Sequence, residues 1–172
     1  MTDTRLRPVT RDDLSMLCRF AVEPELNGFD WRGYGDAQRP ERRFDNDGFL
    51  GPDDGTLIVE HQQVAIGFVN WRAGAYHHVP RYWEIGIALL PESRGRGIGW
   101  RAQAMLCDYL FAHTPVQRIE AGTQPENRAE QRALEKAGFS LEGVIRSFEF
   151  RAGQWRDSYL YSRIRTDPAP QL

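Results

Sequence analysis

Three glycines at alternate positions lie between a strongly apolar segment and the most regular helical pattern of the chain. This loop reads Leu90-Pro-Glu-Ser-Arg-Gly-Arg-Gly-Ile-Gly99. The first turn of a helix carries unpaired N–H groups and about half a positive charge, and glycines let an anion approach that backbone closely. Arg94, Arg96 and Arg101 add guanidinium groups that could reach phosphate oxygens. The spacing therefore predicts an anion-binding loop; the alternative is a tight strand-to-helix turn that the glycines merely shape.

The loop does not match two common phosphate-binding motifs. No Gly-Lys-Ser/Thr follows it, which excludes a Walker A site. A dinucleotide fingerprint needs its third glycine three residues after the second, and Trp100 occupies that position. Nucleotide hydrolysis and hydride transfer therefore lose support.

The loop instead resembles the pyrophosphate loop of the GNAT superfamily of N-acetyltransferases. Its pattern Arg94-x-x-Gly97-x-Gly99 corresponds to the family motif Gln/Arg-x-x-Gly-x-Gly/Ala. The resemblance is close from about residue 56 to residue 164 and weak over residues 1–55. Within the superfamily, the chain resembles the branch that includes ribosomal-protein and polyamine acetyltransferases. The flanking segments that carry it are Trp83-Glu-Ile-Gly-Ile-Ala-Leu-Leu-Pro91, Pro125-Glu-Asn-Arg, Leu134-Glu-Lys-Ala-Gly-Phe139 and Trp155-Arg-Asp-Ser-Tyr-Leu-Tyr161.

This resemblance implies a fold, a donor and a donor site. The fold would be α/β (α+β), with a GNAT-type mixed, mostly antiparallel central sheet flanked by helices. The donor would be acetyl-CoA, with no metal. N–H groups from Gly95 to Gly99 would bind the CoA pyrophosphate, residues 87–89 would pair with pantetheine like an added strand, and Asn127 would contact the cofactor. The expected cofactor-binding residues are Ile87, Ala88, Leu89, Arg94, Gly95, Arg96, Gly97, Ile98, Gly99 and Asn127.

Acetyl transfer to an amine also requires a proton acceptor. An alkyl amine with a pKa near that of lysine, about 10.4, is almost wholly protonated at neutral pH. Glu84 is the predicted general base, because it lies in the expected central strand and many relatives with a Glu-Ile-Gly strand use an acidic residue there. The alternative is a strand glutamate that faces solvent or pairs with an arginine.

The leaving thiolate has no evident proton donor in the sequence. Many GNAT members carry a tyrosine in the helix after the fifth strand, and this chain has Leu134 in that position. Water, the hydroxyl of Tyr159 or Tyr161, or no acid at all remain open, since a CoA thiol with a pKa near that of cysteine, about 8.5, can leave as thiolate.

The segment predicted to bind the amine that accepts the acetyl group is rich in acidic and aromatic residues. Residues 23–60 hold ten acidic and four basic side chains, whereas the remainder holds 14 acidic and 18 basic ones. Trp31 and Tyr34 lie in this acidic segment, and with Glu84 they are the predicted substrate-binding residues. A cationic amine would suit such a surface, although a solvated loop has the same composition.

These residues must be positioned by a mixture of strands and helices. Period-two and period-3.6 patterns, with capping and turn signals, predict the elements. Thr10 with Asp13 opens the first helix, Gln62-Gln63 joins a hairpin, Gly138 ends the last helix, and the apolar run before the loop predicts a central strand. The predicted strands are 5–9, 56–61, 64–71, 82–90, 117–123, 139–151 and 154–165, and the predicted helices are 10–22, 40–47, 98–112 and 127–137.

Within these helices the apolar spacing predicts the buried faces. The first helix is expected to bury Leu14, Leu17 and Phe20 or Ala21. The helix after the loop is expected to bury one stripe and to leave Gln103 outside it. That stripe contains Ile98, Ala102, Met105, Leu106 and Tyr109.

Length and composition place these elements in one domain. The chain has 172 residues, of which 41% are hydrophobic and 27% charged, and the predicted domain covers residues 1–165 with a disordered tail over 166–172. A net charge of -2 argues against a nucleic-acid partner. The chain shows neither a signal peptide nor an apolar run of about 18 residues, which predicts a cytoplasmic protein with no membrane partner.

The cysteine and histidine positions indicate no metal centre. Cys18 and Cys107 lie in apolar helical patterns without metal-ligand spacing and are expected to be buried thiols. His77-His78 is better interpreted as a surface loop than as a ligand pair.

Two functions follow from these patterns. The first is an N-acetyltransferase that moves an acetyl group from acetyl-CoA to a primary amine by direct attack, with a carboxylate as general base. Its acceptor is either a small molecule, such as an amino-sugar antibiotic or polyamine, or a protein N-terminus or lysine. The second is a non-catalytic acyl-CoA-binding or sensing module. Exposed strand edges are compatible with a homodimer.

Overall fold

A computed structural model describes residues 3–75 and 81–170, and its centre is a seven-stranded sheet with the order β1-β2-β3-β4-β5-β7-β6. Only β4 and β5 pair in parallel; every other neighbouring pair is antiparallel. The predicted mixed, mostly antiparallel sheet is therefore confirmed, and β4 lies at its centre. The strands are β1 Thr4–Pro8, β2 Asp54–His61, β3 Val64–Gly74, β4 Tyr82–Leu89, β5 Arg118–Thr123, β6 Ser140–Arg151 and β7 Gln154–Ile164.

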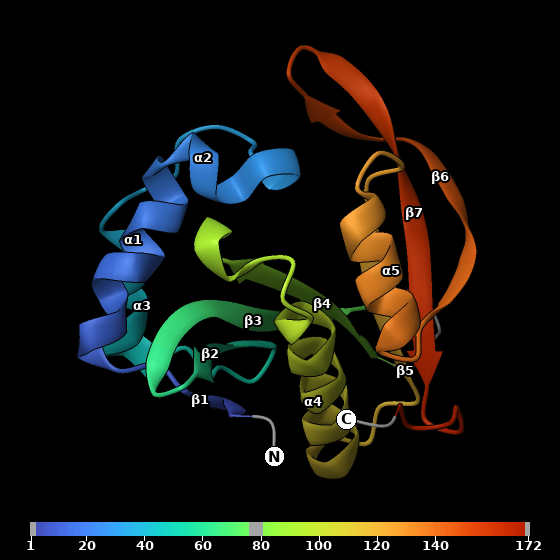
Figure 1. Ribbon diagram of the computed structural model, residues 1–172, viewed down its shortest axis with the longest axis horizontal. Coiled ribbons are helices and arrows are strands. Elements are labelled where there is room, and N and C mark those ends of the chain that lie inside the picture. Colours follow the sequence, from blue (N-terminus) through green and yellow to red (C-terminus); the bar gives the residue numbers. More distant parts are fainter. Residues whose placement is uncertain (1–2, 76–80, 171–172) are drawn as a thin grey trace.

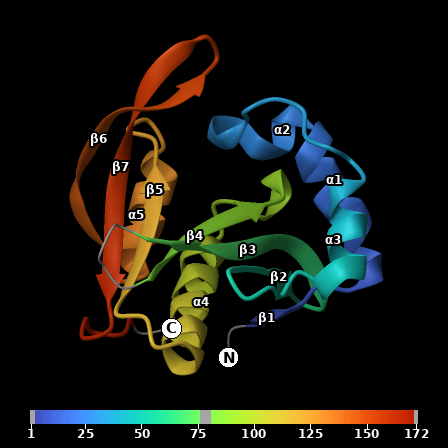
Figure 2. The same ribbon diagram turned by 180° about the vertical axis from the view of Figure 1, so that it is seen from behind.

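Helices cover both faces of the sheet (Figure 1 and, from behind, Figure 2). The first three α-helices cover one face of the sheet. The other two connect β4 to β5 and β5 to β6, and they cover the opposite face. Three short 3-10 turns, η1 Arg11–Asp13, η2 Gly28–Asp30 and η3 Pro91–Ser93, lie before α1, after α2 and after β4. The α-helices are α1 Leu14–Val22, α2 Pro24–Asn27, α3 Arg39–Asp47, α4 Ile98–His113 and α5 Arg128–Lys136.

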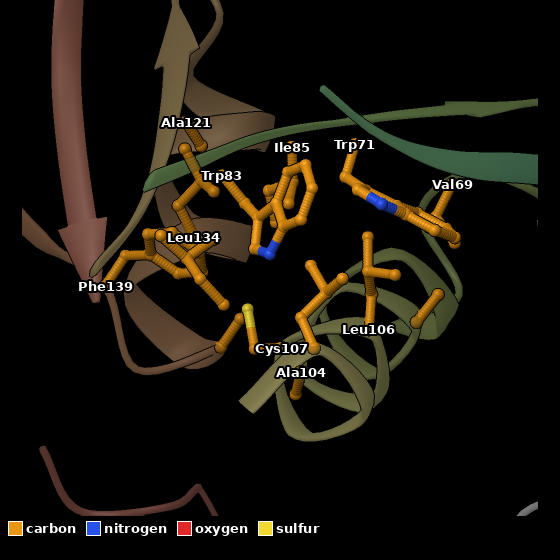
Figure 3. Close-up of a cluster of buried hydrophobic side chains, with 14 of the residues drawn as sticks. Val69, Trp71, Trp83, Ile85, Ala104, Leu106, Cys107, Ala121, Leu134 and Phe139 are labelled. Atoms are coloured by element: carbon orange, nitrogen blue, oxygen red, sulfur yellow. The ribbon is translucent and has the colours of Figure 1, made fainter. Parts of the chain in front are cut away.

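The strand residues alternate between two hydrophobic clusters. In β2, Leu57 and Val59 face the cluster with α4 and α5, whereas Ile58 faces the cluster with α1 and α2. Figure 3 shows the larger cluster, where the indoles of Trp71 and Trp83 lie above the α4 side chains. A sheet buried on both faces explains why β4 has no polar face in the sequence.

Tight turns join the antiparallel pairs as predicted. Gln62 and Gln63 between β2 and β3 have φ angles of 50° and 63°, and Ala152 and Gly153 between β6 and β7 have 50° and 77°. Two successive residues with positive φ match the twist of the flanking strands. The β2–β3 hairpin thus forms without the Asn-Gly signal that usually predicts it.

The four predicted helices form near their predicted bounds, but α2 was not predicted and the buried faces differ. At Thr10 the backbone N–H donates to Asp13 Oδ2 at 2.8 Å, so the predicted cap forms, although the first turn is η1 and α1 starts at residue 14. In α1, Met16 is buried, whereas the predicted Leu14 is only partly buried.

In α4 the predicted stripe is confirmed at Ile98, Ala102 and Leu106, which are buried, and wrong at Met105, which is only partly buried, and at Tyr109. Gln103 is 1% exposed and Tyr109 is 39% exposed, because α4 packs against the sheet on one side and against α5 on another. The prediction for Cys107 is confirmed, whereas Cys18 is wrong: its side chain is partly exposed and donates to the carbonyl of Ala37.

Two predictions concern segments that lie partly or wholly outside the described residues. His77 and His78 lie outside the described residues. The predicted tail is described as far as residue 170, and in it Asp167 Oδ2 accepts a hydrogen bond from the Ile164 N–H at 2.8 Å. Within residues 3–75 and 81–170, no helix combines the length and the apolar character that crossing a membrane requires.

Candidate active site

The two parallel strands at the centre of the sheet separate soon after they meet. They pair only at Trp83 with Ile119 and at Glu84 with Glu120, although β4 continues to Leu89 and β5 to Thr123. Figure 2 shows β4 and β5 running in different directions. Beyond Glu84, β4 pairs with β3 on one edge only, so the N–H and C=O groups of its other edge face the opening. An extended ligand could satisfy these groups as an added strand would.

The predicted phosphate loop lies where β4 leads into α4. Gly95 and Gly97 have φ angles of 71° and 72°, a conformation that glycine adopts at little cost. The backbone N–H groups of Gly95, Arg96 and Gly97 donate to no acceptor among the described residues. Together with the free N–H groups of the first turn of α4, they form a site suited to an anion.

The arginines around this loop have different surroundings. Arg94 donates from Nε to the carbonyl of Leu89 at 2.8 Å and from Nη2 to the carbonyl of Leu26, so its guanidinium links β4 to α2. Arg101 donates to the Gly97 carbonyl at 2.9 Å and stacks on Trp100. Arg96 is exposed, and no hydrogen bond or ion pair engages its side chain within the described chain. Of the three, Arg96 is therefore free to contact a phosphate without losing a protein partner.

The remaining predicted donor residues lie on β4 and at the starts of α4 and α5. Ile87 and Leu89 pack against the cluster on the α4 side, whereas Ala88 packs against the α1–α2 cluster; all three are partly buried. Ile98 is 4% exposed and anchors the start of α4. Asn127 Oδ1 caps α5 by accepting from the Glu130 N–H at 3.3 Å, which leaves its Nδ2 without a described partner.

The predicted base lies at the apex of the opening. Glu84 is the last β4 residue paired with β5, and its side chain is 35% exposed. Both carboxylate oxygens accept from Arg72, at 2.7 and 3.0 Å. To take a proton from an amine, this carboxylate would have to exchange part of its ion pair for the substrate.

Of the two predicted aromatic substrate-binding residues, Trp31 lines a cavity and Tyr34 does not. Trp31 and Tyr34 contact each other edge to face, with ring centroids 5.3 Å apart. Trp31 lines an open cavity of about 320 Å³ with Phe20, Asn27 and Asp30, whereas Tyr34 is absent from its lining and is 81% exposed.

An acidic cluster near the acceptor segment escaped sequence analysis. Gln124 Nε2, at the end of β5, donates to Asp30 Oδ1 and to Glu149 Oε1, both at 3.1 Å. Arg32 Nη2 donates to Glu149 Oε2 at 2.8 Å. Burial alone would raise the pKa of Glu149, but these hydrogen bonds hold it below its usual value. Hydrogen bonds between residues far apart in sequence thus link the η2, β5 and β6 regions. No local sequence pattern predicts these contacts.

A second acidic residue was also missed. Glu130 lies in the first turn of α5, and desolvation raises the pKa of its carboxyl group to about 7. In the sequence it looks like a usual acidic residue near a helix start, so no signal distinguished it.

Known proteins resemble this chain both in sequence and in three-dimensional structure. The family model described as an acetyltransferase (GNAT) domain matches residues 3–140. The probable N-acetyltransferase YjcK of Bacillus subtilis is 37% identical over 83 residues, which are 48% of this chain and 46% of that protein. The spermidine N(1)-acetyltransferase of Escherichia coli K12 is 32% identical over 82 residues, 48% of this chain and 44% of that protein. The matched segment spans about half the length of these curated relatives.

Solved structures agree over almost the whole chain. A spermidine N-acetyltransferase from Vibrio cholerae, in complex with CoA and spermine, has a TM-score of 0.82 at 21% identity and covers 95% of this chain and 96% of that one. RimL, a ribosomal L7/L12 alpha-N-protein acetyltransferase in complex with CoA, has a TM-score of 0.78 at 18% identity, with 95% of each chain covered. At these identities the likeness shows the fold.

Proposed function

The chain belongs to the acetyltransferase (GNAT) family, and on that premise we propose that it transfers the acetyl group of acetyl-CoA to a primary amine. The observation that carries the proposal is the conjunction of a β4 edge without a strand partner and a glycine loop whose N–H groups have no acceptor among the described residues. The β4 edge suits an extended chain that carries amide groups, and the glycine loop suits a diphosphate. CoA contains these two parts one after the other, as pantetheine and pyrophosphate.

In the proposed donor complex, the loop holds the pyrophosphate and Arg96 adds its free guanidinium. Pantetheine runs back along residues 87–89 of β4, toward the apex where β4 and β5 meet. The thioester then lies near that apex, and Asn127 Nδ2 is available to a carbonyl of the cofactor from the far side. A backbone N–H of β4 near Ala88 or Leu89 is the proposed donor to the oxyanion that develops on the thioester carbonyl.

In the proposed reaction Glu84 is the general base. Its position at the apex places a carboxylate at the end of the proposed pantetheine path, on the sheet face opposite α4. An incoming ammonium group competes with Arg72 for the carboxylate, gives one proton to Glu84, and attacks the thioester carbon as a free amine. As the C–N bond forms the C–S bond breaks, CoA leaves as the thiolate, and the second proton lost by the nitrogen goes to solvent.

The proposed acceptor is cationic. Asp30 and Glu149 lie together beside the segment that carries Trp31, and Arg32 and Arg151 are the cations now paired to Glu149. Relatives that act on spermidine and on a ribosomal protein N-terminus support two acceptor classes, a polyamine or other small amine and a protein amine. Both remain within the proposal.

A non-catalytic acyl-CoA-binding module is the second candidate, favoured by Leu134 on α5, which lies where many GNAT members carry a tyrosine. Leu134 is fully buried. Tyr161 is 1% exposed and its hydroxyl faces Glu135 at 3.4 Å; burial and that carboxylate raise the pKa of Tyr161. Acetyl-CoA binding without turnover would establish this second function.

The test uses the full chain with acetyl-CoA. Calorimetry measures binding, and the release of CoA is followed over a panel of polyamines, aminoglycosides and short peptides. Binding and turnover with at least one amine are expected. Arg96→Glu combined with Gly97→Pro should abolish binding, whereas Arg146→Glu, an exposed arginine on β6, should bind as the wild type does. Unchanged affinity in the double variant would overturn the loop assignment.

A further inference from the structure

Exposed apolar side chains gather on the β6–β7 hairpin. Among the described residues, ten large hydrophobic side chains are exposed, and five of them belong to this hairpin. Their exposed fractions are 51% for Leu141, 52% for Val144, 53% for Phe148, 58% for Phe150 and 65% for Trp155. A single exposed apolar residue is ordinary, whereas a contiguous group on one surface marks a place of interaction.

Four of the five side chains lie on the same face of the hairpin. Tyr159 and Tyr161 of β7 pack against the larger hydrophobic cluster, on the side of the sheet that α5 covers. Side chains alternate along a strand, and residues paired across two strands share a face. Trp155 therefore faces the same way as the two tyrosines, and so do the β6 partners of all three. These partners are Phe150, Val144 and Leu141, which with Trp155 form what we call the hairpin stripe.

The stripe is large enough to form much of an interface. The hairpin extends past the end of α5 (Figures 1 and 2), where Phe150 and Trp155 contact each other with ring centroids 5.6 Å apart. A whole aromatic side chain has about 150–250 Å² of surface, so these two rings expose roughly 250 Å² and the stripe roughly 400 Å². Two facing copies would bury about 800 Å², which is the apolar share, about 65%, of a stable interface of about 1,200 Å².

Two opposite charges lie beside the middle of the stripe. Asp157 of β7 shares the face of Trp155 because side chains alternate, and Arg146 belongs to the β6 bulge opposite Asp157. Both side chains are exposed, and neither forms an ion pair within residues 3–75 and 81–170. In that part of the chain, Asp157 Oδ1 accepts a hydrogen bond from the Ser147 N–H at 2.9 Å. A partner that places an opposite charge against each side chain would therefore gain two ion pairs.

We propose that the hairpin stripe is the interface of a homodimer. A two-fold axis that runs parallel to the strands lays β6 of one copy over β7 of the other. Phe150 of each copy then packs on the partner's Trp155, and Arg146 pairs with the partner's Asp157. The axis repeats every contact, so that two aromatic contacts and two ion pairs form together. A surface that is apolar and carries both charges is complementary to itself, which is what such a symmetric contact requires.

The outer edge of β6 is less suited to this contact than the face. β6 is last in the order of the sheet, so its outer edge has no strand partner among the described residues. Its register with β7 shifts between Leu141 and Gly143 and again between Ile145 and Glu149. Such bulges twist an edge and disfavour regular pairing with another strand. The second copy is therefore expected to cover the stripe rather than to extend the sheet.

The opposite face of the hairpin contacts the proposed acceptor segment. Glu149 accepts a hydrogen bond from Arg32, and the guanidinium of Arg151 lies 5.8 Å from the centre of the Phe29 ring. A dimer that covers the stripe would hold the hairpin in the position that these contacts need. The glycine loop proposed to bind CoA lies elsewhere in the same protomer. Loss of the dimer should thus change the KM of the amine more than the Kd of CoA.

Sedimentation velocity of the full chain over an about 100-fold range of concentration tests the interface. The wild type should sediment as a dimer. Phe150→Ser combined with Trp155→Ser should weaken the dimer about 100-fold or more, because both aromatic anchors are lost. Val64→Ser is the matched control, since Val64 is 60% exposed at the start of β3 and lies outside the stripe. Circular dichroism and thermal melting check that each variant folds.

The ion pairs allow a test that keeps the apolar contact. Arg146→Asp and Asp157→Arg should each weaken the dimer about tenfold or more, since each variant brings like charges together across the axis. An equimolar mixture of these two variants should form a heterodimer, because every charge then meets its opposite. The variant that carries both substitutions should dimerise as the wild type does.

Each result decides for or against the interface. A wild type that stays monomeric, a dimer that survives Phe150→Ser with Trp155→Ser, or folded charge variants that do not associate when mixed would each overturn the proposal. If the wild type is monomeric and the double serine variant loses turnover of a peptide acceptor, the stripe binds the acceptor and the dimer is wrong. If the double serine variant does not fold, the charge variants decide, because both substituted side chains are exposed.

Discussion

Arg72 and Glu84 face each other on neighbouring strands and form a two-pronged ion pair, with Nη2 2.7 Å from Oε1 and Nε 3.0 Å from Oε2. The arginine side chain is 68% exposed and the glutamate 35%. Because solvent screens such a pair, its contribution to stability is small, about 0–1 kcal/mol. Either residue can therefore be replaced with little effect on folding.

This relationship gives a test of the proposed base. Glu84→Gln should lower kcat about 100-fold, since a carboxamide cannot accept the proton of the amine. Arg72→Met should keep or raise kcat, because it removes the competitor of the ammonium group. Steady-state release of CoA measures both, and thermal melting controls for folding. An equal loss in the two variants would mean that the ion pair matters and that Glu84 is not the base.

Arg94 and Arg96 should have separable effects. Arg94→Gln removes two hydrogen bonds to carbonyls of β4 and α2 and should lower the free energy of unfolding by about 1–2 kcal/mol. Arg96→Gln loses no partner among residues 3–75 and 81–170, so it should leave that free energy unchanged and weaken acetyl-CoA binding. Urea unfolding and calorimetry measure the two quantities. Equal unfolding free energies for the two variants would argue against the link between β4 and α2.

Glu130 should make the stability of the protein depend on pH. Its folded-state pKa, about 7, is higher than its usual value of 4.5. Between these values the folded protein retains a proton that the unfolded chain has released, so the free energy of unfolding falls as pH rises. The fall is at most about 3 kcal/mol, since the side chain keeps some contact with water.

Glu130→Gln removes this titration, and the variant should therefore gain stability relative to the wild type between pH 5 and pH 8. Urea unfolding at the two pH values measures the gain, and Glu126→Gln should show none. If the difference between wild type and Glu130→Gln is the same at both pH values, the carboxyl group does not titrate in this range.

Gly55 should tolerate no side chain. It pairs with Trp71 across β2 and β3, and an added Cβ would lie 2.1 Å from Cζ2 of that indole. Gly55→Ala must displace the buried ring and should cost about 1–3 kcal/mol of unfolding free energy. Gly143→Ala on β6 is the matched control, because its Cβ would meet nothing within 4 Å. Comparable unfolding midpoints for the two variants would contradict the tight contact.

Most elements could be predicted because their signals are local. The Thr10–Asp13 cap, the Gly138 helix end and the alternating strands each depend on residues close in sequence. Burial of Gln103 was not predictable in this way, because it depends on α5 packing against α4 from a distant part of the chain. The same holds for the pairing of Glu149 with Arg32, which are 117 residues apart.

The sequence by itself determined the family, the mixed sheet and the position of the phosphate loop, since glycine spacing and periodicity are written in consecutive residues. Only the tertiary structure decided that β4 and β5 part after Glu84, that Arg94 faces carbonyls while Arg96 stays free, and that Arg72 holds Glu84. It also decided that Glu130 is desolvated. These properties arise from strand pairing and from the loss of water around a charge, and neither is encoded in the order of neighbouring residues.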